Sequence, residues 1–243
     1  QNVNAYNFEG KKLSDLIKKI IKINEIARVR YTTSHPVDFT EDLIEVHGSS
    51  KKLMPMIHLP VQSGSNKILQ NMNRKHSVEY YIDLIKKIKK INSKIEFSSD
   101  FIIGYPGETE VDFKLTLDLI KEIKFINCYS FIYSQRTGTP AAKLDPIDIK
   151  IAKKRLIKFQ AEADMIKIKF KKRFFNKKIF VFFENRIGSK NEYFGRDMYS
   201  NSVIVKSDKN LIGKIQLVEI LSGNLNTFVG QIIQEHQGEV FAA

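Results

Sequence analysis

The residues best placed to do chemistry in this sequence lie in a polar loop after a short apolar run. Residues 57–59 have the pattern of a buried strand, and a loop containing Gln62, Ser63 and Gly64 follows it. A helix is predicted to begin near Ser65. Open α/β sheets and β/α barrels bind ligands at such loops, between a strand end and a helix N-terminus. Glycine permits close backbone approach, and free helix N–H groups favour negative charge. The loop is therefore a candidate ligand site.

The same order of strand, polar loop and helix recurs along the chain. Three further units have strand-like runs at 28–33, 95–103 and 128–134, followed by polar loops at 36–38, 104–109 and 136–140. Four such units predict a parallel β/α architecture whose polar loops gather at one rim.

Helix signals lie between these runs. Apolar residues at helical spacing predict a helix over 13–21, and Thr40 and Ser77 are predicted N-caps of two later helices. Thr109 with Asp112 has the spacing of a capping box. A long helix is predicted over 149–175, and its polar faces carry many basic residues, Arg155 among them. Residues 1–10 are polar and irregular, so the expected barrel lacks its first strands, and we expect the chain to begin inside a longer protein.

The pattern changes beyond Asn176. Strand-like runs at 179–183, 202–206, 212–220 and 227–233 are separated by clusters of Gly, Asn, Ser and Asp. Short strands of this kind predict a small barrel of the oligonucleotide-binding type.

Composition favours a polyanionic partner. The 243 residues carry a formal net charge of +13, with a sequence pI near 9.6. An excess of this size favours nucleic acid first and a membrane surface second. No apolar run is long enough to span a membrane. The single cysteine excludes an internal disulfide framework and suits a reducing cytosol.

Five stretches of the first part of the chain have distinctive sequences. They are Gln-Asn-Val-Asn-Ala-Tyr at 1–6, Arg-Tyr-Thr-Thr-Ser-His-Pro at 30–36, His-Leu-Pro-Val-Gln-Ser-Gly-Ser at 58–65, Ser-Ser-Asp-Phe-Ile-Ile-Gly-Tyr-Pro-Gly-Glu-Thr at 98–109, and Tyr-Ser-Phe-Ile-Tyr-Ser at 129–134. In this order they resemble the radical S-adenosylmethionine methylthiotransferases that modify tRNA. In the tail, Gly-Arg at 195–196, Asn201 and Leu-Ile-Gly-Lys at 211–214 resemble the RNA-binding TRAM domain.

The resemblance implies an α/β fold in three parts. Residues 1–172 would be the C-terminal part of a radical-SAM, TIM-like parallel β/α barrel, 173–236 a TRAM barrel, and 237–243 a disordered tail. It implies a cytoplasmic, monomeric enzyme that methylthiolates isopentenyladenosine at position 37 of tRNA. Its partners would be the tRNA anticodon arm and a sulfur donor. Related branches act on threonylcarbamoyladenosine or on a ribosomal protein aspartate, and both stay open.

The implied cofactors are S-adenosylmethionine and [4Fe-4S] clusters. In the family, three cysteines of a C-x3-C-x2-C loop hold one cluster, and three cysteines of an N-terminal domain hold a second. This sequence has neither set, and Cys128 lies in an apolar run where we expect it in the core. We therefore expect no cluster on this chain and no catalysis by it alone.

The family's rim loops imply two sets of site residues. The predicted cofactor-binding residues are Asn2, Asn4, Ser34, Gln62, Ser63, Ser99 and Asp100, with His35 facing the same cavity. The predicted substrate and RNA-binding residues are Arg136, Lys171, Lys172, Arg173, Phe194, Arg196 and Lys214. At 136–140 the sequence has Thr137 where the family has proline, which leaves that loop less rigid.

Two other functions remain open. One is a metal-dependent β/α-barrel hydrolase with the ligands His35, Asp38, His58, His76 and Asp100. The other is an inactive remnant that acts as an RNA-binding module, which accounts for both the charge and the missing cysteines.

Overall fold

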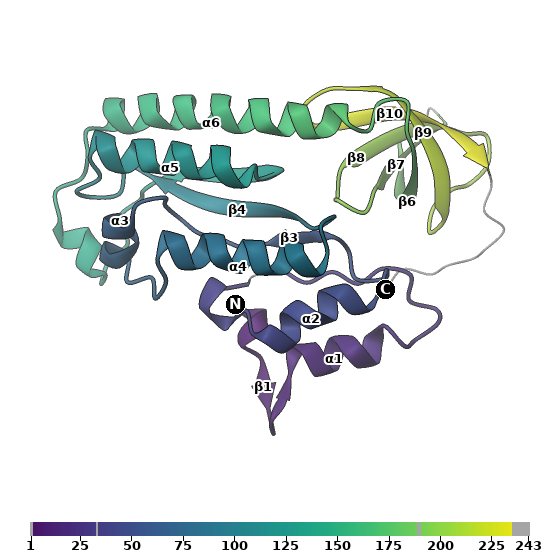
Figure 1. Ribbon diagram of the computed structural model, residues 1–243. Coiled ribbons are helices and arrows are strands. Elements are labelled where there is room, and N and C mark those ends of the chain that lie inside the picture. The colour runs from purple at the N-terminus through teal and green to yellow at the C-terminus, as the bar shows by residue number, and fades with distance from the viewer. Residues whose placement is uncertain (1, 33, 189–190, 235–243) are drawn as a thin grey trace. The chain divides into compact units, whose positions relative to one another are not determined.

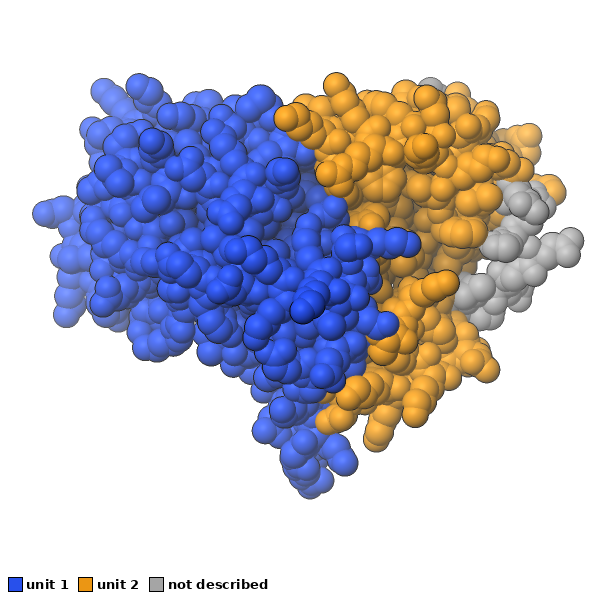
Figure 2. All heavy atoms as spheres, viewed as in Figure 1, with its two compact units in different colours: residues 1–13, 31–48, 57–167 blue, residues 14–30, 49–56, 168–243 orange. Residues whose placement is uncertain are grey.

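The computed structural model describes residues 2–32, 34–188 and 191–234 (Figure 1). The chain divides into two compact units (Figure 2): residues 1–13, 31–48 and 57–167, and residues 14–30, 49–56 and 168–243. The segments 14–30 and 49–56 thus belong with the C-terminal part of the chain. The predicted disordered tail, 237–243, lies outside the described residues.

A three-stranded sheet forms the centre of the first unit. Its strands are β3 (Met56–His58), β4 (Glu96–Ile103) and β5 (Asn127–Ile132), in the order β3-β4-β5. β5 pairs parallel to β4, and the loop after β3 makes a parallel bridge from Gln62 to Phe101. The helices α3 (Asn66–Asn71), α4 (Val78–Ile91), α5 (Glu110–Ile123) and α6 (Ile149–Lys172) alternate with these strands (Figure 1). The predicted parallel β/α order is confirmed.

The helices begin where the sequence predicts. The Ser65 and Ser77 side chains accept hydrogen bonds from Ile68 N and Tyr80 N, which caps α3 and α4. Thr109 and Asp112 form the predicted capping box of α5.

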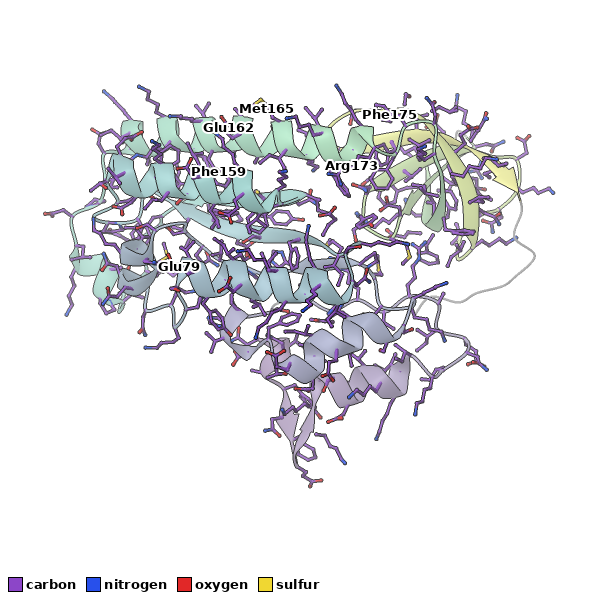
Figure 3. The ribbon with its side chains drawn as sticks, viewed as in Figure 1. Glu79, Phe159, Glu162, Met165, Arg173 and Phe175 are labelled. Atoms are coloured by element: carbon purple, nitrogen blue, oxygen red, sulfur yellow. The ribbon has the colours of Figure 1, made fainter. Side chains whose placement is uncertain are left out.

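Alternate residues of β4 face in different directions. Phe101 is fully buried, and its ring lies 4.8 Å from that of Phe159 on α6. Figure 3 shows Phe159 pointing from α6 toward the sheet, while Met165 points away from it.

Arg155 on α6 is also buried, because its guanidinium pairs with the Glu108 carboxylate at 2.7 Å. Its assignment to the basic surface of the helix was therefore wrong.

The first predicted strand is also wrong. In the described part of 28–33, Val29 makes one isolated parallel bridge to Leu53, and these residues do not form a strand. The Arg28 guanidinium instead donates to the carbonyl oxygens of Phe180 and Arg196. Residues 1–10 were predicted as irregular, but β1 (Asn7–Phe8) lies among them and pairs antiparallel with β2 (Lys11–Lys12). The helices α1 (Leu13–Ile20) and α2 (Glu41–Ser49) follow it.

The second unit contains a closed five-stranded barrel. Its strands are β6 (Lys178–Ile187), β7 (Glu192–Arg196), β8 (Ser202–Lys206), β9 (Ile215–Gly223) and β10 (Thr227–Gln234), in the order β10-β8-β7-β6-β9. Val181, Phe183, Val218 and Phe228 are fully buried in its core. The small TRAM-like or oligonucleotide-binding barrel is confirmed, although the sequence patterns missed β7. In the described residues, no helix is long and apolar enough to cross a membrane.

Candidate functional site

A cavity of about 700 Å³ opens in the first unit beside the loops that follow β3, β4 and β5. Five of the predicted residues line it: Asn2, Ser34, Gln62, Asp100 and Arg136. His35 lines it as well, and Ile102, Tyr105 and Ala141 supply apolar surface. The cavity therefore combines polar groups with an apolar wall, as small-molecule sites usually do.

The β4 strand explains why Asp100 lines the cavity and Ser99 does not. Successive side chains of a strand point to opposite faces. Asp100 and Ile102 face the cavity, whereas Ser99 is fully buried and its hydroxyl accepts a hydrogen bond from Val61 N at 2.9 Å. The Ser99 side chain therefore holds the loop that carries Gln62.

Gln62 occupies the cavity wall in an unfavourable backbone conformation. Its φ of 78° lies in the left-handed region that favours glycine. Two backbone hydrogen bonds fix it to β4, from Gln62 N to Asp100 O and from Ile102 N to Gln62 O, each 3.0 Å long. A strained non-glycine residue whose surroundings hold it in place is a frequent feature of binding sites.

Asn4 and Ser63 support loops and do not line the cavity. The Asn4 amide donates to His35 O and accepts from His35 N, both at 2.8 Å. Ser63 is 1% exposed, and its hydroxyl accepts from Ser65 N. The seven predicted cofactor residues thus divide into four that line the cavity and three that position its loops.

The structure adds Arg74 to the site, a residue the sequence patterns did not single out. Its Nη2 donates to Pro60 O at 3.0 Å, and its Nε is buried without a hydrogen-bond partner in the described part of the chain. Burial lowers the pKa of the Arg74 guanidinium, and the Asp100 carboxylate acts against that shift. Arg74 follows the short helix α3, and its distance in sequence from the loop that carries Gln62 concealed it.

Two further buried polar groups near Arg74 have no hydrogen-bond partner among the residues that the structure describes. They are the Ser34 hydroxyl, which lines the cavity, and both ring nitrogens of His76. Burial, Arg74 and His35 together lower the pKa of His76 to about 4. Buried polar groups are normally hydrogen-bonded. The unpartnered Ser34 hydroxyl and Arg74 Nε therefore mark a wall suited to a polar ligand.

The predicted RNA-binding residues of the second unit differ in exposure. Lys172, Arg173 and Lys214 are exposed. Lys171 is 3% exposed, and its ammonium donates to Leu225 O and lies 4.2 Å from the centre of the Phe228 ring. Lys171 therefore serves the fold, and we leave it out of the proposed RNA surface.

Phe194 and Arg196 lie together on β7. The Arg196 guanidinium lies 5.0 Å from the centre of the Phe194 ring, and its Nε pairs with the Glu184 carboxylate at 3.1 Å. Arg196 is therefore held in place by the barrel.

An iron–sulfur cluster does not fit the residues of this chain. Such a cluster needs several thiolates, and the sequence supplies only Cys128. Burial raises the pKa of that thiol to about 12, and Lys167 lowers it by less. The described residues also contain no group of three His, Cys, Asp or Glu side chains able to hold a metal ion. The residues named for the metal-dependent hydrolase, His35, Asp38, His58, His76 and Asp100, all lie in the described part of the chain and form no such group.

Comparison with known proteins shows which proteins this chain resembles. Residues 5–120 match the sequence profile of the Radical SAM superfamily. The tRNA-2-methylthio-N(6)-dimethylallyladenosine synthase of Pelagibacter ubique is 51% identical over 244 residues, which cover 99% of this chain and 55% of that protein. The enzyme of the same name from Rickettsia akari is 45% identical over 240 residues, covering 96% of this chain and 54% of its own length.

A solved structure supports the same fold. Coproporphyrinogen III oxidase from Escherichia coli, described as a radical SAM enzyme, superposes with a TM-score of 0.52 at 14% identity. The match covers 76% of this chain and 50% of the oxidase. Residues 5–120 are therefore similar to the Radical SAM superfamily and, along nearly all of its length, the chain is similar to about half of the tRNA-2-methylthio-N(6)-dimethylallyladenosine synthases that it matches.

Proposed function

We propose that this chain forms part of an enzyme that adds a methylthio group to isopentenyladenosine, also called dimethylallyladenosine, at position 37 of tRNA. The observation that carries the proposal is the 51% identity to a synthase of this name over 99% of the chain. The chain spans about half of that relative's length, so the reaction of the whole enzyme needs groups that this chain does not supply.

The cavity of the first unit is the proposed site for S-adenosylmethionine. Asp100 can accept hydrogen bonds from ribose hydroxyls, and the free Arg74 Nε can pair with a carboxylate. Gln62 and Ser34 offer polar contacts, and Ile102 and Tyr105 an apolar surface. When bound, S-adenosylmethionine supplies the methyl group and the radical chemistry of the superfamily. The chain's own residues bind and orient it.

The barrel and the exposed basic residues before it are the proposed contact for the tRNA anticodon arm. Lysine and arginine neutralise phosphates, and aromatic side chains stack on unpaired bases. Lys172, Arg173 and Lys214 supply the cations and Phe194 the aromatic ring, and Arg196, whose charge is paired with Glu184, is the proposed contact to a base. Arg136, which is exposed at the rim of the cavity, is the proposed contact of the first unit with the substrate.

The test is the nucleoside content of tRNA. The complete gene that contains the coding sequence of this chain is expressed in a bacterium that lacks its own methylthiotransferase, because this chain alone lacks the cysteines of a cluster, and tRNA nucleosides are analysed by mass spectrometry. We expect 2-methylthio-isopentenyladenosine to appear, and to fall at least tenfold with Asp100→Ala. Lys206→Ala, an exposed change on the barrel, is the control for expression. A soluble product that leaves isopentenyladenosine unmodified contradicts the proposal and favours the RNA-binding module.

Gln62→Gly gives a second test of the cavity. Glycine adopts the φ of 78° without strain, so we expect the variant to be more stable by about 1 kcal/mol. Loss of the side chain weakens S-adenosylmethionine binding if Gln62 is a contact. Thermal melting and calorimetric titration of the same sample measure both effects. Greater stability with unchanged binding removes Gln62 from the site.

A further inference from the structure

A second, smaller cavity of about 210 Å³ lies in the second unit, between the segments 28–30 and 196–200. Its wall carries three guanidinium groups, from Arg28, Arg30 and Arg196. The acidic groups in the wall are Glu184 and Asp197. Three positive charges against two negative ones leave one positive charge at the site.

The structure shows which positive charge remains. Arg28 is committed to the barrel, because its guanidinium donates to Arg196 O at 2.9 Å and to Phe180 O at 3.0 Å, and it faces Asp197. Arg196 is committed as well, because its Nε pairs with the Glu184 carboxylate and its Nη1 donates a hydrogen bond to Ser200 O.

Both carboxylates are also used. Asp197 accepts hydrogen bonds from Tyr199 N, Asn201 N and Asn201 Nδ2, each 2.8 Å long. Glu184 pairs with Arg196 Nε through both oxygens. Neither acid is left to neutralise another cation.

Arg30 is different from its two neighbours. It is exposed, and its Nη1 donates a single hydrogen bond, 2.6 Å long, to the Ser200 hydroxyl. Among the residues that the structure describes, no carboxylate lies within ion-pair distance of it. Ser200 holds φ at 60°, which fixes the turn and its hydroxyl beside the guanidinium. Four N–H donors of Arg30 therefore remain available on a side chain that is already oriented.

We propose that Arg30 and Ser200 form a binding site for a single backbone phosphate of the RNA substrate. Arginine offers a planar fork of donors that suits phosphate oxygens. The cavity is several times larger than the space of one water, about 30 Å³, and admits a phosphodiester group. The site adds a contact from outside the barrel strands to the RNA surface, and it rests on the proposed tRNA substrate.

The test uses anticodon stem-loops in which one phosphate at a time is replaced by an uncharged methylphosphonate. With the wild-type chain, we expect one replacement to weaken binding about tenfold. Arg30→Ala should weaken binding of the natural stem-loop by a similar factor and lower the salt slope of the binding constant by about one unit. The decisive result is that Arg30→Ala and that one replacement show no additional loss when combined.

The controls separate this site from the general positive charge. Arg186→Ala removes an exposed arginine of the same unit that lies outside the cavity, and should change affinity less than twofold. Arg30→Lys keeps the charge without the fork and should recover only part of the affinity. Inorganic phosphate should compete with the stem-loop for the wild-type chain but not for Arg30→Ala.

Two results overturn the proposal. The first is that Arg30→Ala and Arg186→Ala lose the same amount of stem-loop affinity. The second is that the loss caused by Arg30→Ala adds fully to the loss caused by every methylphosphonate. Either result shows that Arg30 acts only through the overall charge. Tight binding by wild type with either result leaves the proposed function standing. If the wild-type chain does not bind the stem-loop at any salt concentration, the proposed function and this site fail together.

Discussion

At the scale of single residues, Asp112 joins the loop after β3 to the start of α5. Its carboxylate accepts hydrogen bonds from the Ser65 hydroxyl at 2.7 Å and from Thr109 N at 2.8 Å, and it pairs with Lys67 at 3.1 Å. Burial alone would raise the pKa of Asp112, but these hydrogen bonds outweigh it and lower the pKa below its ordinary value. The ionised form therefore stabilises the fold.

This shift predicts a pH dependence of stability. A group with a lowered pKa contributes stability above its unfolded pKa, about 3.9, and loses it as the pH falls toward the folded pKa. We expect Asp112→Asn to lower the free energy of unfolding by about 1–3 kcal/mol at pH 7. Below about pH 4, the free energy of unfolding should decrease less steeply with falling pH in the variant than in the wild type. Urea unfolding between pH 2.5 and 7 measures both. Asp83→Asn, an exposed change on α4, should have little effect. Parallel pH curves for wild type and Asp112→Asn would contradict the assignment.

The sequence predicts which residue types line the cavity. It also contains information on which way their side chains point, and the predicted set did not take this fully into account. Ser99 and Asp100 are neighbours on β4, so the twofold repeat of a strand already excludes both from the same cavity. The roles of Asn4 and Arg74, unlike those of Ser99 and Asp100, could not be predicted from a strand repeat. Each depends on contacts across the fold, to the His35 backbone and to Pro60 O, which no local pattern encodes.

At the scale of elements, Gly64 sets the distance between the cavity loop and α5. A Cβ at this position would lie 2.5 Å from Leu115 O and 2.6 Å from Thr116 Cα. Gly64 N also donates to the Thr116 hydroxyl at 3.0 Å. Because the obstruction is backbone, a larger residue must move the loop or the helix.

Gly64→Ala should therefore be strongly destabilising. We expect a loss of about 1–3 kcal/mol, with weaker S-adenosylmethionine binding because the loop carries Gln62. Gly107→Ala is the matched comparison. A Cβ there meets nothing within 4 Å, but φ is +79°, so we expect only the cost of the left-handed conformation, about 1–2 kcal/mol. Chemical denaturation of both variants checks this. A smaller loss for Gly64→Ala than for Gly107→Ala would show that α5 shifts at little cost.

Most elements followed from the sequence because their signals are local. Capping residues and apolar spacing fixed the starts of α3, α4 and α5. The prediction of a strand over 28–33 was wrong because its apolar and β-branched residues have a strand-like pattern. In the structure, Arg28 and Arg30 instead donate hydrogen bonds to oxygen atoms of residues more than 150 positions away in the second unit. β7 was missed because a five-residue strand with Gly195 inside it gives a weak pattern.

At the scale of the whole molecule, charge and burial together decide which cations can reach RNA. The net charge of +13 makes many lysines plausible contacts, but it does not distinguish an exposed ammonium from a buried one. The adjacent residues Lys171 and Lys172 provide a direct comparison. Lys171 is buried against the Phe228 ring and Leu225 O, and Lys172 is exposed.

These two lysines should affect RNA binding in different ways. Each phosphate contact releases a counterion, so loss of one contact lowers the salt slope of the binding constant by about one unit. We expect Lys172→Ala to lower the slope by up to that amount and to leave the melting temperature unchanged. Lys171→Met should lower the melting temperature and leave the slope unchanged, because its ammonium is held inside the unit. Stem-loop affinity measured across a salt series, with melting curves for each variant, separates the two. A reduced slope for a fully folded Lys171→Met would mean that its ammonium leaves Phe228 to meet the RNA. An unchanged slope for both would place the end of α6 outside the RNA interface.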